Sequence, residues 1–159
     1  DDFMLLDKPN QVDMNTSSRF PPNPVKYMFY SDYMSDFLDV TVQDNVNSYE
    51  YYKNALQNET HTAYLVFDEE KFVGAGGVSY FQVMPTYHNP SGYKAYIMNM
   101  YTNPEYRRNG IAFKTLGLLV EDAKKRGVHA ISLEATDMGK PLYVKFGFVK
   151  MNDEMELLD

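Results

Sequence analysis

The residues best suited to chemistry lie in one short stretch between Tyr101 and Ala112. Arg107, Gly110 and Ala112 follow the spacing Arg-x-x-Gly-x-Ala, and a long amphipathic segment comes directly after them. At the start of a helix several backbone N–H groups have no partner inside the helix, and the helix dipole adds positive character. A glycine leaves those groups open to a ligand, and the neighbouring Arg108 adds charge. The stretch therefore predicts a binding site for an anion such as a pyrophosphate.

Taken alone, the pattern is short, and an ordinary helix start with a capping glycine would also explain it. Its surroundings favour the binding site. A strand predicted over 94–101 precedes it. The segment that follows is a predicted helix with an apolar stripe made of Ala112, Phe113, Leu116, Leu119, Val120 and Ala123. Gly127 is placed to end that helix.

The remaining elements of the second part of the chain are predicted from alternation and turn residues. Strands are expected over 63–67, 72–83, 129–136 and 148–157, and a short helix over 140–146. A cluster of glycines in the second strand, Gly74, Gly76 and Gly77, indicates a bend or a close approach of the backbone to another element. The pattern predicts an α+β fold in which helices flank a mixed sheet, with one domain over 1–159 and its core in 61–159.

Residues 1–60 carry mixed signals. A short strand over 3–6, an irregular connector over 20–24, and one or two helices over 27–37 and 49–56 are expected. The segment 27–37 is rich in large apolar side chains: Tyr27, Met28, Phe29, Tyr30, Tyr33, Met34 and Phe37. At helical spacing these residues favour a core, and the alternative is a pocket wall to which Asp32, Asp36 and Asp39 would attract ammonium groups.

The composition limits the kinds of function. The 159 residues include no cysteine, which excludes disulfides, thiolate metal sites and a cysteine nucleophile. The three histidines are scattered and are expected to be surface or core residues, so no metal site is predicted. A net charge of −7 argues against nucleic acid as a partner and mildly favours a cationic substrate. No apolar run approaches the roughly 20 residues of a membrane span, and a cytoplasmic location is expected.

Two motifs together resemble the GNAT superfamily of N-acetyltransferases. The cofactor loop of that superfamily has the form Arg/Gln-x-x-Gly-x-Gly/Ala, and Pro104-Glu105-Tyr106 before it also fits. The closing motif is matched by Pro141-Leu142-Tyr143-Val144-Lys145-Phe146-Gly147-Phe148. The resemblance runs from about residue 63 to residue 157. It implies transfer of an acetyl group from acetyl-CoA to a primary amine of a small molecule or peptide.

The resemblance also implies where the cofactor binds. The sheet would be mostly antiparallel, with a V-shaped split between the strands at 96–100 and 131–134. Pantetheine would pair with the backbone near Met98 and Met100, where a backbone N–H would also receive the acetyl carbonyl. The pyrophosphate, with Arg107 beside it, would lie on the backbone amides of Arg108, Asn109, Gly110, Ile111 and Ala112. The usual opening strand and first helix of the superfamily are not found before residue 63, and this region normally shapes the acceptor pocket.

Direct attack of an amine on a thioester requires a proton acceptor for the amine and a proton donor for the departing thiolate. Tyr143 occupies the tyrosine position of the closing motif and is the predicted acid. Glu134, on the strand beside the split, is the candidate base. Many members of the superfamily carry a carboxylate on the strand that leads to the cofactor loop, but residues 96–101 contain none. Asp137 and a water chain to solvent are therefore alternatives to Glu134.

Two other functions fit the same resemblance. The chain could be a catalytically silent domain that binds acyl-CoA in a regulatory role, which the presence of Tyr143 disfavours. It could also be a protein-lysine acetyltransferase, for which an acidic groove should favour basic peptides over free amines. A homodimer is compatible with each of these functions.

Overall fold

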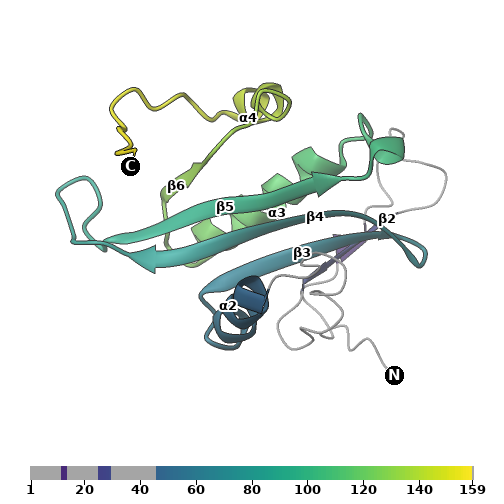
Figure 1. Ribbon diagram of the computed structural model, residues 1–159, viewed down its shortest axis with the longest axis horizontal. Coiled ribbons are helices and arrows are strands. Elements are labelled where there is room, and N and C mark those ends of the chain that lie inside the picture. The colour runs from purple at the N-terminus through teal and green to yellow at the C-terminus, as the bar shows by residue number, and fades with distance from the viewer. Residues whose placement is uncertain (1–11, 14–24, 30–45, 159) are drawn as a thin grey trace.

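The computed structural model describes residues 12–13, 25–29 and 46–158. One sheet contains, in chain order, β1 (Val12–Asp13), β2 (Val25–Phe29), β3 (His61–Asp68), β4 (Lys71–Gln82), β5 (Tyr93–Thr102) and β6 (Ala130–Leu133). The helices are α2 (Val46–Gln57), α3 (Ile111–Lys125) and α4 (Lys140–Phe146), and a 3-10 turn, η1 (Pro104–Tyr106), precedes α3. Figure 1 shows the long strands β3, β4 and β5 as the central layer, with α4 next to the end of β6.

The sheet is mixed and mostly antiparallel, as predicted. All neighbouring strands from β1 to β5 are antiparallel, whereas β5 and β6 are parallel. A parallel pair requires a crossover connection, and α3 provides it. The α+β architecture inferred from the sequence is therefore confirmed.

The core has two parts, one on each face of the sheet. Successive residues of a strand point to opposite faces. On one face, Tyr64 and Val66 of β3 pack in a cluster with the buried side chains of α3. On the other face, Ala63 and Leu65 pack in a cluster with Tyr52 and Leu56 of α2. We call these the α3 face and the α2 face.

The helix α3 has the amphipathic pattern that the sequence predicts. Its buried residues are Ile111, Thr115, Leu116, Leu118, Leu119, Val120 and Ala123. It lies close to β4. A Cβ atom added to Gly76 of β4 would come within 2.7 Å of the Thr115 Cγ2 atom. After the helix, Gly127 has a φ of +73°, the left-handed conformation that a glycine adopts readily at a helix C-terminus. The predictions of a close approach at the glycine cluster and of a stop at Gly127 are both confirmed.

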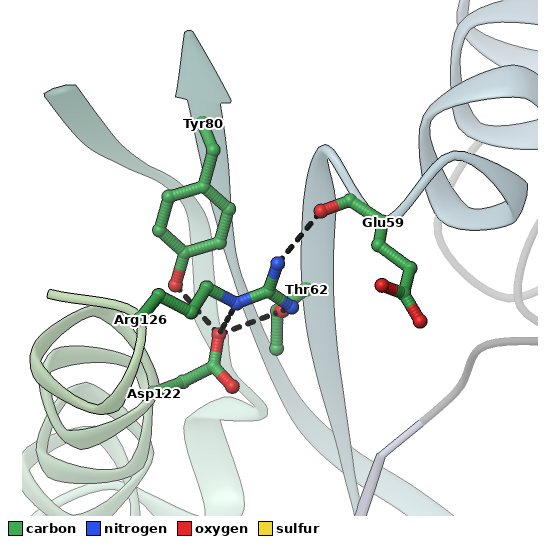
Figure 2. A network of polar contacts seen from close by, with 5 residues as sticks. All are labelled: Glu59, Thr62, Tyr80, Asp122 and Arg126. Atoms are coloured by element: carbon green, nitrogen blue, oxygen red, sulfur yellow. Dashed lines mark hydrogen bonds and ion pairs between the residues drawn. The ribbon is translucent and has the colours of Figure 1, made fainter. Parts of the chain in front are cut away.

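A polar network joins the C-terminal end of α3 to the sheet (Figure 2). The Asp122 Oδ2 atom accepts hydrogen bonds from the Tyr80 hydroxyl at 2.6 Å, the Thr62 hydroxyl at 2.8 Å and the Arg126 Nε at 3.0 Å. The Arg126 guanidinium also donates to the Glu59 carbonyl at 2.7 Å and lies 4.5 Å from the centre of the Tyr80 ring. Burial, and then the hydrogen bond to Asp122, raises the pKa of Tyr80, so its hydroxyl remains a donor. The network fixes the C-terminal end of α3 to the sheet.

The segment after α4 differs from its prediction. Residues 148–157 form no strand in the structure. Gly147 turns the chain with a φ of +120°, and the available edge, that of β6, is only 4 residues long. Without a long partner strand the segment stays exposed, as Val149 at 85 % and Met155 at 98 % exposure show. The strand predicted over 129–136 is likewise limited to β6, because its pairing with β5 ends at Leu133.

The N-terminal predictions are tested only in part. Residues 27–29 belong to the strand β2 and not to a helix, so that part of the helix prediction is wrong. Aromatic and β-branched residues at Val25, Tyr27 and Phe29 favour an extended backbone over the helix that we predicted. The helix predicted over 49–56 is confirmed by α2. The segments 3–6, 20–24 and 30–37 lie outside the described residues.

Candidate active site

The sheet splits where β5 and β6 diverge. Their pairing runs from Lys94 and Ala130 to Ile97 and Leu133 and goes no further, although β5 continues to Thr102. Figure 1 shows β6 running away from β5 toward α4. Beyond Ile97, therefore, no strand within the described residues pairs with β5 on the β6 side. This is the V-shaped split implied by the resemblance.

A β-bulge lies in β5 at the same point. The register with β4 shifts between Ala75 and Gly77, which pair with Tyr101 and Met98 respectively. The extra residue on β5 is in this interval, and Asn99 there has a φ of +54°, in the left-handed region. A bulge bends its strand and redirects the neighbouring side chains. It therefore changes the direction of β5 at the opening of the split.

Hydrogen bonds within the loop between β5 and α3, and from this loop to the turn between β3 and β4, hold the loop in place. The Asn103 side chain caps η1 by accepting from the Glu105 N–H at 3.0 Å. Lys71 donates to the Glu105 carboxylate at 2.8 Å, and the Tyr106 hydroxyl donates to Asp68 at 2.6 Å. These contacts fix the loop that carries the Arg-x-x-Gly-x-Ala pattern before any ligand binds.

The end of this loop has the geometry of an anion site. Gly110 is the N-cap of α3, with a φ of +81° and no side-chain hydrogen bond to the first amides of the helix. A Cβ atom added to Gly110 would meet no described atom within 4 Å apart from its chain neighbours, so the space on that side of the glycine is open. Arg108 also has a positive φ, +64°, and Arg107 donates through Nε to the Thr102 carbonyl at 3.2 Å. Open helix amides flanked by two guanidinium groups attract an anion.

A cavity of about 440 Å³ joins this loop to α4. Seven of the residues predicted from the sequence line it: Met100, Arg107, Arg108, Gly110, Ile111, Ala112 and Tyr143. The Ile111 side chain is 1 % exposed and belongs mainly to the core, so its backbone is the part offered to a ligand. The cavity has both a polar, cationic end and apolar walls, which include Phe113 and Leu142.

Three other predicted residues lie away from the lining of this cavity. Asn109 donates to the Tyr106 carbonyl at 3.1 Å and so stabilises the loop. The Met98 side chain lies on the α2 face, where its sulfur accepts a hydrogen bond from the Ser79 hydroxyl at 3.2 Å. Glu134 follows the last residue of β6 and is exposed. The Glu134 carboxylate lies beside the Tyr96 hydroxyl. Burial, and then the charge of Glu134 and a hydrogen bond with it, raises the pKa of Tyr96. Asp137, the alternative base, is exposed before α4.

Tyr143 lies in α4, which begins after Gly139. Its ring packs closely on Gly139, where an added Cβ would come within 3.0 Å of the Tyr143 Cε2 atom. The ring also meets Phe148 edge-on, with 6.2 Å between centroids. Burial raises the pKa of the Tyr143 hydroxyl, so the phenol stays protonated at neutral pH and can donate.

A polar cluster on the α2 face was not predicted from the sequence. His61 is 1 % exposed, and its Nδ1 atom lies 3.0 Å from the Ser79 hydroxyl oxygen. The Tyr51 hydroxyl also contacts this oxygen and lies 3.3 Å from the same Nδ1 atom. The His61 Nε2 atom has no partner among the described residues and faces the backbone of Gly77. The only local signal is a lone histidine two residues before the predicted strand over 63–67, which does not distinguish a surface residue from a buried one.

This cluster makes the fold sensitive to acid. Burial lowers the pKa of His61 from 6.5 to about 4. The folded state therefore holds the neutral imidazole, and this contribution is complete above pH 6.5 and is lost as the pH falls toward 4. The free energy of unfolding should lose about 3 kcal/mol over this range from His61 alone. Urea unfolding at pH 7 and pH 4.5 should show a smaller difference in His61→Asn than in the wild type.

The matched control for this prediction is His129→Asn, because His129 is exposed. The control should keep the pH dependence of the wild type. An equal pH dependence of the wild type and His61→Asn would show that His61 is not the group responsible.

Comparison with known proteins agrees with this geometry. The sequence model of the acetyltransferase (GNAT) family matches residues 26–148. The chain belongs to the GNAT family of acetyltransferases. No curated protein sequence matches it. A predicted acetyltransferase from Clostridium acetobutylicum, whose structure contains acetyl-CoA, is 30 % identical, with a TM-score of 0.74, over 84 % of this chain and 96 % of that one.

More distant GNAT structures share the fold. Glucosamine-6-phosphate N-acetyltransferase from Arabidopsis thaliana is 16 % identical, with a TM-score of 0.62 over 83 % of this chain and 97 % of that one. The aminoglycoside acetyltransferase meta-AAC0020 from an uncultured soil sample is 13 % identical, with a TM-score of 0.67 over 85 % and 95 %. Within the described part of this chain, no helix is long and apolar enough to cross a membrane, and no group of three His, Cys, Asp or Glu residues is placed to hold a metal.

Proposed function

We propose that this GNAT protein transfers the acetyl group of acetyl-CoA to a primary amine of a small molecule or peptide by direct attack. One observation carries the proposal: a single cavity is lined both by the anion site at Gly110 and by Tyr143. The cavity also reaches Met100, beside the split in the sheet. A phosphate group and a reacting thioester belong to the same long molecule, and this cavity offers a place for each.

The residues present fit coenzyme A. The open amides before Ile111 and the guanidinium groups of Arg107 and Arg108 match the charge of a pyrophosphate. The apolar walls match a pantetheine chain, and the unpaired backbone of β5 beyond Ile97 offers it hydrogen bonds. Bound acetyl-CoA would supply an activated thioester. The backbone N–H groups of Met98 and Met100 remain the proposed partners of pantetheine and of the acetyl carbonyl.

The chain itself has two proton transfers to perform. The attacking amine forms a C–N bond to the acetyl carbon, the C–S bond breaks, and the amine loses one proton. Glu134 is the proposed acceptor of that proton, with Asp137 or water as alternatives, because its carboxylate lies next to the split and is open to solvent. Tyr143 donates its hydroxyl proton to the departing sulfur and regains one from solvent.

The acceptor is a cationic or amine-bearing molecule in this proposal. The net charge of −7 favours such molecules through long-range attraction. Two GNAT proteins of similar fold are named for their action on glucosamine 6-phosphate and on aminoglycosides. Glucosamine 6-phosphate and the aminoglycosides both carry amino groups on sugar rings, so they belong in a first acceptor panel.

The test is release of free thiol from acetyl-CoA in the presence of spermidine, free lysine, glucosamine 6-phosphate, sisomicin or a basic peptide. We expect at least one free amine to accelerate thiol release, and a metal chelator to leave binding of acetyl-CoA unchanged. Binding of acetyl-CoA without transfer to any amine would contradict the proposal and favour a silent acyl-CoA-binding domain. Transfer to the basic peptide alone would favour a protein-lysine acetyltransferase.

A further inference from the structure

The residues of β5 around the split divide between the two faces of the sheet. Ala95 and Ile97 belong to the core of the α3 face, and Met100 packs against it. Tyr96 and Met98 alternate with them, and Met98 contacts Ser79 on the α2 face. The cavity described above adjoins α3 and α4. A molecule bound there therefore reaches β5 from the α3 face, and the α2 face of the split remains for a second molecule.

Asn99 is the residue of the bulge that faces the α2 side. Its side-chain amide nitrogen donates a hydrogen bond to the Tyr52 hydroxyl of α2. Tyr52 itself is 3 % exposed, and its ring meets the His61 ring edge-on at 5.0 Å between centroids. Asn99, in contrast, is exposed. A buried and fixed hydroxyl thus holds one side of an exposed amide.

This hydrogen bond decides the orientation of the amide. An asparagine amide has a donor side and an acceptor side, and the donor side is directed to Tyr52. Burial, and then the nearby Tyr51, raises the pKa of Tyr52 to about 12, so the phenol is neutral at working pH. The Asn99 Oδ1 atom is therefore presented as a hydrogen-bond acceptor on the α2 side of the split.

We propose that Asn99 binds the acceptor amine through Oδ1 and that Tyr52 is a positioning residue that holds the Asn99 amide. The proposal rests on the acetyl transfer proposed above. Asn99 lies between Met98 and Met100, the two residues assigned to the thioester, so an amine on its side chain is close to the carbonyl. Glu134, the proposed proton acceptor, lies beside Tyr96, which is three residues before Asn99 in the same strand, β5.

A neutral oxygen is chemically suited to this role. A carboxylate in contact with an amine favours the protonated form, which has no lone pair for attack. An amide carbonyl accepts one N–H of the neutral amine with a smaller effect on its pKa. The nitrogen lone pair then stays available for the acetyl carbon.

The left-handed conformation of Asn99 determines which variants are informative. Because its φ is +54°, an alanine would strain the bulge, whereas glycine adopts this conformation without steric strain. Asn99→Gly therefore removes the amide and keeps the backbone. Tyr52→Phe removes the hydroxyl and keeps the buried ring. Ser79→Ala is the matched control. Ser79 also lies on the α2 face, but its hydroxyl donates a hydrogen bond to Met98 and not to Asn99.

The experiment measures KM for the best amine of the panel, kcat, and the dissociation constant of acetyl-CoA in each variant. We expect Asn99→Gly to raise KM for the amine about tenfold, and Tyr52→Phe to raise it in the same direction but less. The double variant should resemble Asn99→Gly alone, because Tyr52 acts through Asn99. The acetyl-CoA dissociation constant should stay within about twofold in all of them, and Ser79→Ala should keep the wild-type KM.

The outcomes separate this inference from the proposed function. A wild type that transfers acetyl groups, with an unchanged amine KM in Asn99→Gly, overturns the role of Asn99 and leaves the proposed function intact. Additive effects of the two substitutions overturn the positioning role of Tyr52. A weaker affinity of Asn99→Gly for acetyl-CoA, without a change for the amine, places Asn99 on the cofactor side and also overturns the inference. A wild type inactive with every amine contradicts the proposed function, and the inference then fails with it.

Discussion

Tyr143→Phe is expected to lower kcat by about 10²- to 10⁴-fold, the usual contribution of a positioned acid. The substitution removes one oxygen and keeps the ring that packs on Gly139 and Phe148. Folding and acetyl-CoA binding should therefore change little. KM for the amine should change less than kcat, because the hydroxyl acts on the departing sulfur and not on the acceptor. Steady-state kinetics together with calorimetry of acetyl-CoA binding measure all of these quantities.

Two controls make the result specific to acid catalysis. The loss in Tyr143→Phe should shrink with a thioester whose thiol is more acidic, since such a thiolate needs less help from a proton. Tyr87→Phe makes the same chemical change at a side chain that is 94 % exposed in the loop between β4 and β5, and should be neutral. A wild-type kcat in Tyr143→Phe would remove this residue from the mechanism, and a variant that does not fold would assign it a structural role.

Gly110→Glu is expected to abolish acetyl-CoA binding. The added carboxylate would stand at the N-cap of α3, next to its first amides, and repel a pyrophosphate. The fold should survive, because a Cβ atom at Gly110 meets no described atom within 4 Å apart from its chain neighbours. The φ of +81° adds a strain of about 1–2 kcal/mol. Calorimetry with acetyl-CoA gives the loss of binding, and thermal unfolding gives the strain.

Gly127→Glu is a matched control, since it places the same residue at the other end of the same helix. Gly127 also has a positive φ, +73°, and open space around it. Its substitution should cost at least as much stability, because a carboxylate is unfavourable at the C-terminal end of a helix, and leave acetyl-CoA binding intact. Normal binding by Gly110→Glu would refute the anion site, and equal losses of binding in both variants would attribute the effect to strain.

The part of the site that could be predicted from the sequence is the part built from contiguous residues. The loop that ends at Gly110, the amphipathic stripe of α3 and the short helix carrying Tyr143 each have a local signature. The structure brings these segments to one cavity, although they are separated in sequence. Their roles in binding and catalysis remain predictions that the substitutions above would test.

The polar cluster on the α2 face could not be predicted in the same way. His61 contacts Ser79, and Tyr52 contacts Asn99, through pairs that are 18 and 47 residues apart. Neither pair has a periodic or motif-like signal, because each contact arises from strand register and from a helix packed across the sheet. The positive φ of Asn99 has only a weak signal, a single asparagine in a mostly apolar part of the strand, because most asparagines do not adopt this conformation.

The strand predicted over 148–157 is absent from the structure for a related reason. Residues 154–157 alternate between Glu and an apolar residue, as an exposed strand does. Alternation reports how a strand would present its side chains and not whether a partner edge exists. The edge of β6 is too short to provide one, so the local pattern does not decide the structure there.

The split between β5 and β6 has a kinetic consequence. In the arrangement proposed above, acetyl-CoA approaches β5 through the cavity on the α3 face, and the amine approaches from the side of Asn99. Two substrates that arrive through separate entrances do not compete for space, so both can be present when the acetyl group moves. Double-reciprocal plots of initial rate against acetyl-CoA concentration, at several fixed amine concentrations, should then give intersecting lines. Parallel lines, which indicate a covalent acetyl-protein, should not be seen. The acetylated product could also leave while the thiol is still bound.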